Sequence, residues 1–101
     1  MDLFDLRITV TKIEGRSVCG LAVGDYFEVS QSSQITVPPG KHLCLYALAS
    51  LLPLLPAKQR QLDPSDWLAI DSMACCPDPD ERVTFTIERG ALRTYDHQQL
   101  T

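Results

Sequence analysis

Only one segment of this chain has the pattern of a helix, and this scarcity constrains the fold more than any other feature. Residues 42–52 carry apolar side chains at helical spacing, and Pro53 and Pro56 are expected to end or kink the helix. The stretch Pro38-Pro39-Gly40 is expected to end the preceding strand just before this helix. One helix covers one face of a sheet, so the other apolar residues are expected on strands.

Alternating apolar and polar residues, the pattern of half-buried strands, occur on both sides of this helix. The segments expected to form strands are 5–10, 25–30, 35–37, 69–76 and 83–88. A short helical turn carrying Trp67 is expected after Asp63–Asp66. This order predicts an α+β fold: a mostly antiparallel sheet of four to five strands with one main helix packed on one face. The other face is then open to a second subunit.

The length of 101 residues and the net charge of −4 restrict the domain organisation and the partners that we expect. We expect a single α+β domain over residues 1–90 and a polar C-terminal tail over residues 91–101. The basic residues are scattered, which argues against nucleic acid and anionic membrane as partners. The chain has no long apolar run and starts without the basic region of a signal peptide, so we expect a cytoplasmic protein with reduced thiols.

Cys44 is the first candidate for a reactive or metal-binding residue. We expect it in the first turn of the helix, where free backbone N–H groups and the helix dipole favour a thiolate. Lys41 and His42 add positive charge close by in sequence. The alternative is a small buried residue on the core face of the helix, the usual role of a free cysteine.

The other cysteines are Cys19, in the loop before the second strand, and the adjacent pair Cys75 and Cys76. Adjacent side chains on a strand point to opposite faces, so only one of that pair can share a site with Cys44; alternation leaves open which one. Cys19, Cys44 and Cys76, with His42 as an auxiliary ligand, would suit zinc or an iron–sulfur cluster. The chain lacks paired CxxC motifs, and His42 and Cys44 do not face each other on a regular helix.

Three stretches of sequence together resemble a known family. They are residues 8–15 followed by Cys19 and Val23-Gly24-Asp25-Tyr26-Phe27; Leu43-Cys44 with Ala47 and Pro53; and residues 74–79 followed by Val83 and Phe85. The combination resembles the small bacterial family TIGR04076 over about residues 5–89. That family is functionally uncharacterised.

The pattern of this family places cysteines at the positions of Cys19, Cys44 and Cys76, whereas Cys75 is additional. The resemblance therefore implies a shared three-thiol site. The chain departs from the pattern at residues 56–61, which replace a glycine-containing segment, and at Gly20, which directly follows Cys19.

Three functions follow as hypotheses. The leading one is a small cytosolic protein whose site of Cys19, Cys44 and Cys76 binds a soft metal or acts as a redox or ligand-binding thiol centre. The alternative is a non-catalytic, oligomeric interaction module whose cysteines only pack. The third is a small enzyme with Cys44 as nucleophile and His42 as its base. The ligand is not specified by any of these patterns.

Overall fold

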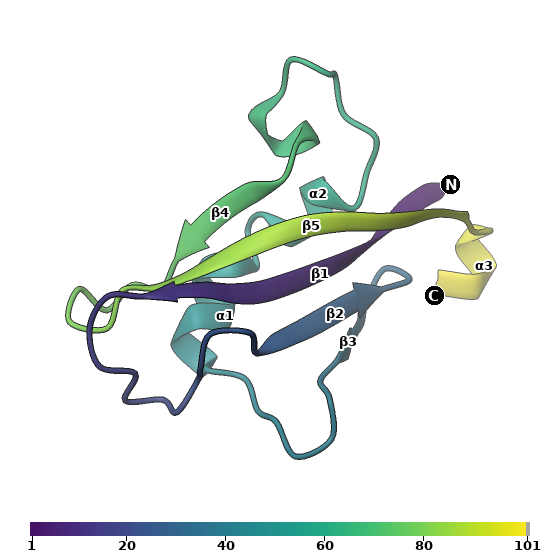
Figure 1. The fold of residues 1–101 in the computed structure, drawn as a ribbon. Coiled ribbons are helices and arrows are strands. Elements are labelled where there is room, and N and C mark those ends of the chain that lie inside the picture. Colours follow the sequence, from purple (N-terminus) through teal and green to yellow (C-terminus); the bar gives the residue numbers. More distant parts are fainter. Residues whose placement is uncertain (101) are drawn as a thin grey trace.

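The protein forms a single antiparallel sheet of five strands, described over residues 1–100 in a computed structural model (Figure 1). The strands are β1 (Asp2–Ile13), β2 (Tyr26–Ser30), β3 (Gln34–Thr36), β4 (Ser72–Cys75) and β5 (Val83–Thr94). Their order across the sheet is β3-β2-β1-β5-β4, and every neighbouring pair is antiparallel. The expected α+β class with an antiparallel sheet is confirmed.

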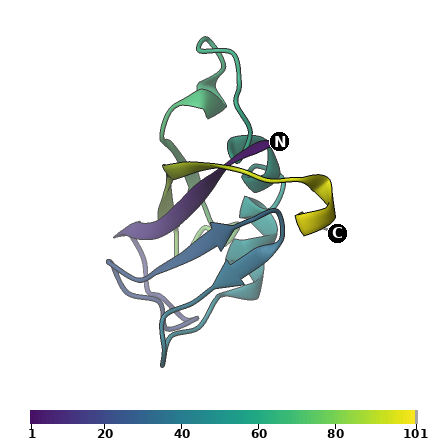
Figure 2. The same ribbon diagram turned by 90° about the vertical axis from the view of Figure 1, so that its right-hand side faces the viewer.

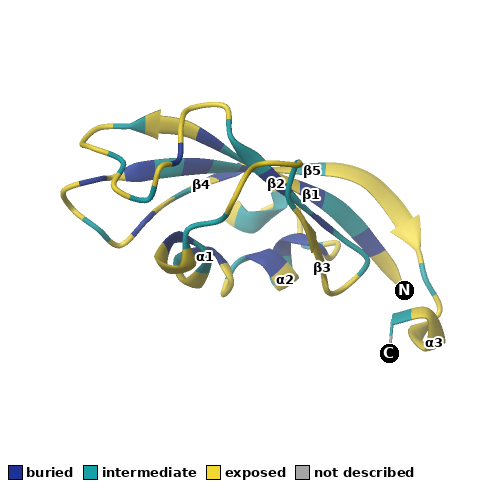
Figure 3. Ribbon diagram, turned by 90° about the horizontal axis from the view of Figure 1, so that it is seen from below, coloured by how far each residue is buried: buried dark blue, intermediate teal, exposed yellow. Residues whose placement is uncertain are grey.

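Two short helices replace the single helix expected over residues 42–52. They are α1 (Leu45–Leu51) and α2 (Leu55–Lys58), and both lie beneath the same face of the sheet (Figure 3). Pro53 separates them, as expected from its missing N–H. The helix begins later than expected because Cys44 has an extended backbone, with φ −86° and ψ 124°.

The helical turn expected at Trp67 is present as η1 (Trp67–Ala69). Asp66 caps it, because its side chain accepts a hydrogen bond from the backbone N–H of Leu68 at 2.9 Å. The strand expected over residues 69–76 is therefore limited to β4. Figures 1 and 2 both show the loop of residues 60–71, which contains η1, projecting beyond the sheet.

The core lies between the sheet and the two helices. Along the three central strands β2, β1 and β5, alternate apolar side chains point toward the helices. They include Ile8, Phe27 and Ile87, which belong to one core cluster with Ala47 and Leu51 of α1. Ile8 pairs with Phe27 on one side and with Ile87 on the other, so the register aligns the apolar sets of the three strands.

The opposite face of the sheet is polar. Arg7 forms an ion pair with Glu28 at 3.0 Å and lies 4.3 Å over the ring of Tyr26. Thr11 and Thr86 are within hydrogen-bond distance through their hydroxyl groups, at 3.1 Å. Such a face is compatible with water, so the open face does not itself require a second subunit.

The segment expected as a tail, residues 91–101, is only partly outside the sheet. β5 continues to Thr94, and Asp2, Leu3 and Phe4 of β1 pair with its end. The sequence there lacks alternation because these β5 residues are exposed. Residues 97–100 form the short helix α3 (His97–Leu100), which extends from the end of β5 (Figure 2). Within residues 1–100, no helix is long and apolar enough to cross a bilayer.

Candidate functional site

Glu81 joins the loop after β1 to the turn between β4 and β5. Its side chain is buried, and Oε1 accepts hydrogen bonds from the backbone N–H groups of Val18 and, at 3.1 Å, of Cys19. Gly15 donates its N–H to the carbonyl of Glu81 at 3.0 Å. A Cβ at Gly15 would lie 1.6 Å from the carbonyl oxygen of Asp80, so only glycine permits this close approach.

His42 connects the segment before α1 to the same loop. Its Nε2 donates to the carbonyl oxygen of Cys19 at 2.6 Å, which places a proton on that nitrogen. Lys41 forms an ion pair with Asp25 at 3.1 Å. The pKa of Asp25 lies below its ordinary value of 3.8, first because the backbone N–H of Ala22 donates to it and then because of Lys41.

Cys76 is a core residue. It is 7% exposed, and its sulfur accepts a hydrogen bond from the backbone N–H of Val83 at 3.3 Å. Its sulfur also lies 3.8 Å from the carbonyl oxygen of Asp78. Cys75 is exposed, in agreement with the opposite orientations expected for adjacent strand residues.

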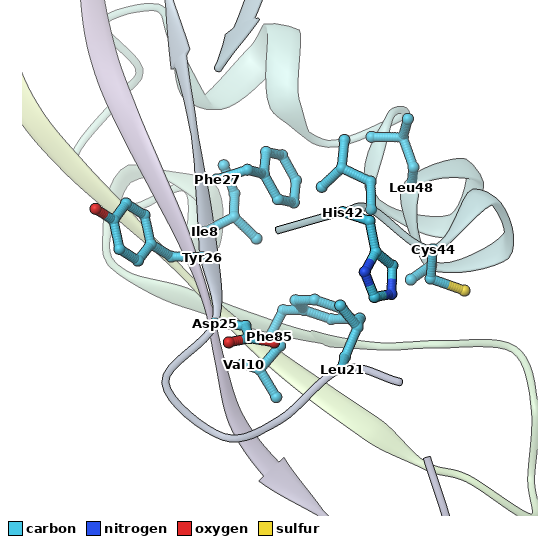
Figure 4. Close-up of a pocket in the computed structure, with 12 residues that line it drawn as sticks. Ile8, Val10, Leu21, Asp25, Tyr26, Phe27, His42, Cys44, Leu48 and Phe85 are labelled. Carbon is cyan, nitrogen blue, oxygen red and sulfur yellow. The ribbon is translucent and has the colours of Figure 1, made fainter. Parts of the chain in front are cut away.

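Cys44 lies at the boundary between core and solvent. It occupies the N-cap of α1 instead of the first turn, and its side chain forms no capping hydrogen bond. Figure 4 shows its sulfur directed away from the imidazole of His42. This orientation does not provide the nucleophile–base pair that the enzyme hypothesis requires.

The cavity beside Cys44 is small. It lies between α1 and the sheet, and His42, Leu21 and Phe27 are among its lining residues (Figure 4). Its volume is about 10 Å³, which is close to the minimum for a single water molecule. A small-molecule substrate does not fit there in this conformation.

The three cysteines of the expected site contact one hydrophobic core but do not form a ligand set. Cys76 belongs to the buried cluster, and Cys19 and Cys44 pack against it half-buried. All four cysteines are free thiols. In the described part of the chain, no group of three or more His, Cys, Asp or Glu side chains could hold a metal ion. Zinc or iron–sulfur binding remains a prediction.

Two buried charged residues were not anticipated from the sequence. Glu81 belongs to an acidic turn that resembles a solvated loop, yet it is 6% exposed. Lys58 is fully buried; its Nζ donates to Ser72 Oγ and to the Leu68 carbonyl, both at 3.0 Å, and to the Ile70 carbonyl. The only sequence signal for Lys58 is its helical spacing from Leu55, which is also buried.

No family model, curated protein or solved structure matches this chain. The resemblance to family TIGR04076 therefore stays a prediction, as does the three-thiol site that it implies.

Proposed function

We propose that this protein is a non-catalytic interaction module that associates with a second copy of itself. The observation that carries the proposal is the outward face of α1. The helix has no charged residue, and Leu45 and Tyr46 are 74% and 70% exposed. Leu52, the C-cap of α1, is 47% exposed.

Helical spacing places Leu45, Ala49 and Leu52 on the same side of α1, away from the buried Ala47 and Leu51. A helix that is apolar on all sides is normally buried on all sides. Contiguous apolar surface on a small domain is typical of a contact site. The outward face of α1 therefore has the character of an interface.

A second copy can meet this face without a close pair of like charges. The net charge of −4 opposes association between copies, because like-charged molecules repel one another. The outward face of α1 carries no charge, so contact between two such faces about a two-fold axis adds no like-charge pair at the interface.

Light scattering at several concentrations tests this function. The wild type should show an average mass above that of the monomer, rising with concentration. Leu45→Lys and Tyr46→Lys should each shift the protein toward monomer. Val18→Lys is the matched control, because Val18 is 70% exposed and lies in the loop after β1 instead of on α1. A wild type that remains monomeric throughout contradicts the proposal.

A thiol centre is the second candidate, favoured by the half-buried state of Cys19 and Cys44 and by the hydrogen bond of His42 to the Cys19 carbonyl. Elemental analysis of the purified protein and alkylation of its native thiols test it. Bound zinc or iron, or selective labelling at Cys44, would support this function. Absence of metal together with uniformly unreactive Cys19, Cys44 and Cys76 would exclude it.

A further inference from the structure

We infer that the second copy inserts Trp67 into a groove beside α2, an arrangement that rests on the proposed self-association. The inserted segment is the Trp67 loop, residues 60–71. The receiving surface is the α2 groove, with a volume of about 120 Å³. Its lining residues are Val29, Ile35, Leu52, Leu55, Pro56 and Gln59, together with Ser32 and Ser33 between β2 and β3.

The Trp67 loop exposes apolar side chains in a projecting position. Trp67 is 59% exposed and Ile70 is 65% exposed. Tryptophan dominates binding energy at protein interfaces because it has a large apolar area and one polar N–H group. An exposed tryptophan at the end of a projecting loop has the form of an anchor.

Two buried or half-buried cations fix the backbone of this loop. Lys58 donates to the carbonyl groups of Leu68 and Ile70. Arg89 donates to the carbonyl groups of Ala69 at 2.9 Å and Arg60 at 2.8 Å. The backbone that carries Trp67 is therefore ordered before binding, which lowers the entropy cost of association.

The α2 groove matches this anchor in polarity. Val29 and Leu55 are buried in it, and Ile35 and Leu52 are 41% and 47% exposed at its sides. The Nε2 of Gln59 donates to the carbonyl oxygen of Gln31 at 2.6 Å. Gln59 is 2% exposed and its Oε1 accepts no hydrogen bond within residues 1–100, so an indole N–H would reach this oxygen only from inside the groove that Gln59 lines.

The loop carries acidic residues beside its exposed apolar side chains, whereas its first residue, Arg60, lies at the groove, whose lining residues are uncharged. Asp66 and Asp71 flank the exposed apolar residues of the loop, and no Lys, Arg or His occurs between Arg60 and Arg82. Arg60 donates from its guanidinium group to the carbonyl oxygen of Pro56 at the groove, at 2.7 Å, and has no ion pair in the described chain. Docking would bring the acidic loop of one copy near Arg60 of the other.

Both surfaces adjoin α2. α2 contacts η1, and its residues Leu55, Pro56 and Gln59 line the groove. The arrangement inferred here is reciprocal: each copy inserts its loop into the groove of the other, about a two-fold axis. The groove also includes Leu52, so it is continuous with the outward face of α1.

The first test uses Trp67 itself, which is the only tryptophan in the chain. Its emission should shift to shorter wavelength as the wild type associates, over the same concentration range as the rise in mass. Trp67→Ala should weaken association about thirtyfold or more, as for an interface hot spot. Trp67→Phe should weaken it less. Met73→Ala is the matched control, because Met73 is 70% exposed on β4.

The second test uses complementary variants. Ile35→Glu places a carboxylate in the groove and leaves Trp67 intact, whereas Trp67→Ala leaves the groove intact. Each variant alone should be mainly monomeric, with a wild-type circular dichroism spectrum. Their mixture should associate more strongly than either alone, since one Trp67 and one intact groove then meet.

The outcomes separate this arrangement from the proposed function. If the wild type associates but Trp67→Ala associates equally well, the inferred insertion of Trp67 is wrong and the proposed self-association is still supported. The same conclusion follows if the mixture associates no more strongly than either variant alone. If the wild type is monomeric throughout and its emission does not change with concentration, both are wrong.

Discussion

The carboxylate of Glu81 accepts the backbone N–H of Cys19 at 3.1 Å, across 62 positions of the sequence. This bond fixes the loop after β1 against the turn that precedes β5. His42 binds the carbonyl group of the same Cys19 at 2.6 Å, so both backbone groups of this cysteine are engaged. Glu81 and His42 thus connect the segments that bear these cysteines, whereas the sulfurs form only local contacts: that of Cys76 accepts the Val83 N–H, and that of Cys19 lies 3.6 Å from Ser17 Oγ.

Replacement of Glu81 should weaken the attachment of the loop after β1 to the turn before β5. Glu81→Ala leaves two backbone N–H groups without their acceptor; a fully buried unsatisfied group costs about 1–3 kcal/mol, and these part-buried groups should cost less because water can reach them. We expect a lower free energy of unfolding in urea and faster hydrogen exchange at Val18 and Cys19. The control is Glu88→Ala, at an exposed position on β5. Unchanged exchange at Val18 and Cys19 would show that the Glu81 bonds do not hold the loop.

Gly15→Ala should be strongly destabilising, because the new Cβ would lie 1.6 Å from the carbonyl oxygen of Asp80. Relief requires separating two backbone segments, and such overpacking costs about 1–3 kcal/mol or more. Gly90→Ala is the control, since its Cβ would be 3.4 Å from the nearest atom, the carbonyl oxygen of Asp5. Thermal unfolding of both variants checks this; equal melting temperatures would contradict the close approach at Gly15.

Asp25 should contribute to stability in a pH-dependent way. Its pKa in the folded protein is below the ordinary value of 3.8, because of the Ala22 N–H and Lys41. The unfolded chain therefore binds the proton more readily, and the contribution is present above about pH 3.8 and lost as pH falls through the folded pKa. The difference in free energy of unfolding between wild type and Asp25→Asn should shrink over that range.

Carboxyl titration by NMR checks the cause of this shift. Lys41→Met should move the pKa of Asp25 upward toward 3.8 but not fully, since the Ala22 N–H remains. A wild-type Asp25 that titrates at or above 3.8 would contradict both the hydrogen bond and the ion pair.

The cysteines should differ in reactivity and in their effect on stability. An aromatic disulfide reagent should label the exposed Cys75 first and the buried Cys76 last, with Cys19 and Cys44 between them. Cys76→Ser should cost about 1–3 kcal/mol, because it places a hydroxyl in the core. Cys75→Ser should be nearly neutral. Fast labelling of native Cys76 would mean that the turn at residues 76–82 opens readily.

Much of the sheet follows from local sequence patterns. The alternation of Val83, Phe85 and Ile87 predicts the start of β5, and Asp66 predicts the cap of η1. The last part of β5 was missed because its residues are exposed and it is paired only with the start of β1, almost 90 positions away. Local periodicity contains no information about such a partner.

The buried charges were missed for a related reason. A lysine is normally exposed, and the carbonyl groups that bind Lys58 lie 10 and 12 positions away in an irregular loop. Carbonyl groups occur at every residue, so no sequence pattern marks these as acceptors. Cys44 was placed within the helix because apolar spacing extends across it, whereas its backbone is extended.

Sedimentation equilibrium of the wild-type protein, from low micromolar to near-millimolar concentration, tests the central claim most directly. Self-association through an uncharged apolar surface predicts an average mass that rises from monomer toward dimer and is little weakened by salt. A single monomer mass over the whole range would contradict the proposal that this protein is a self-associating interaction module.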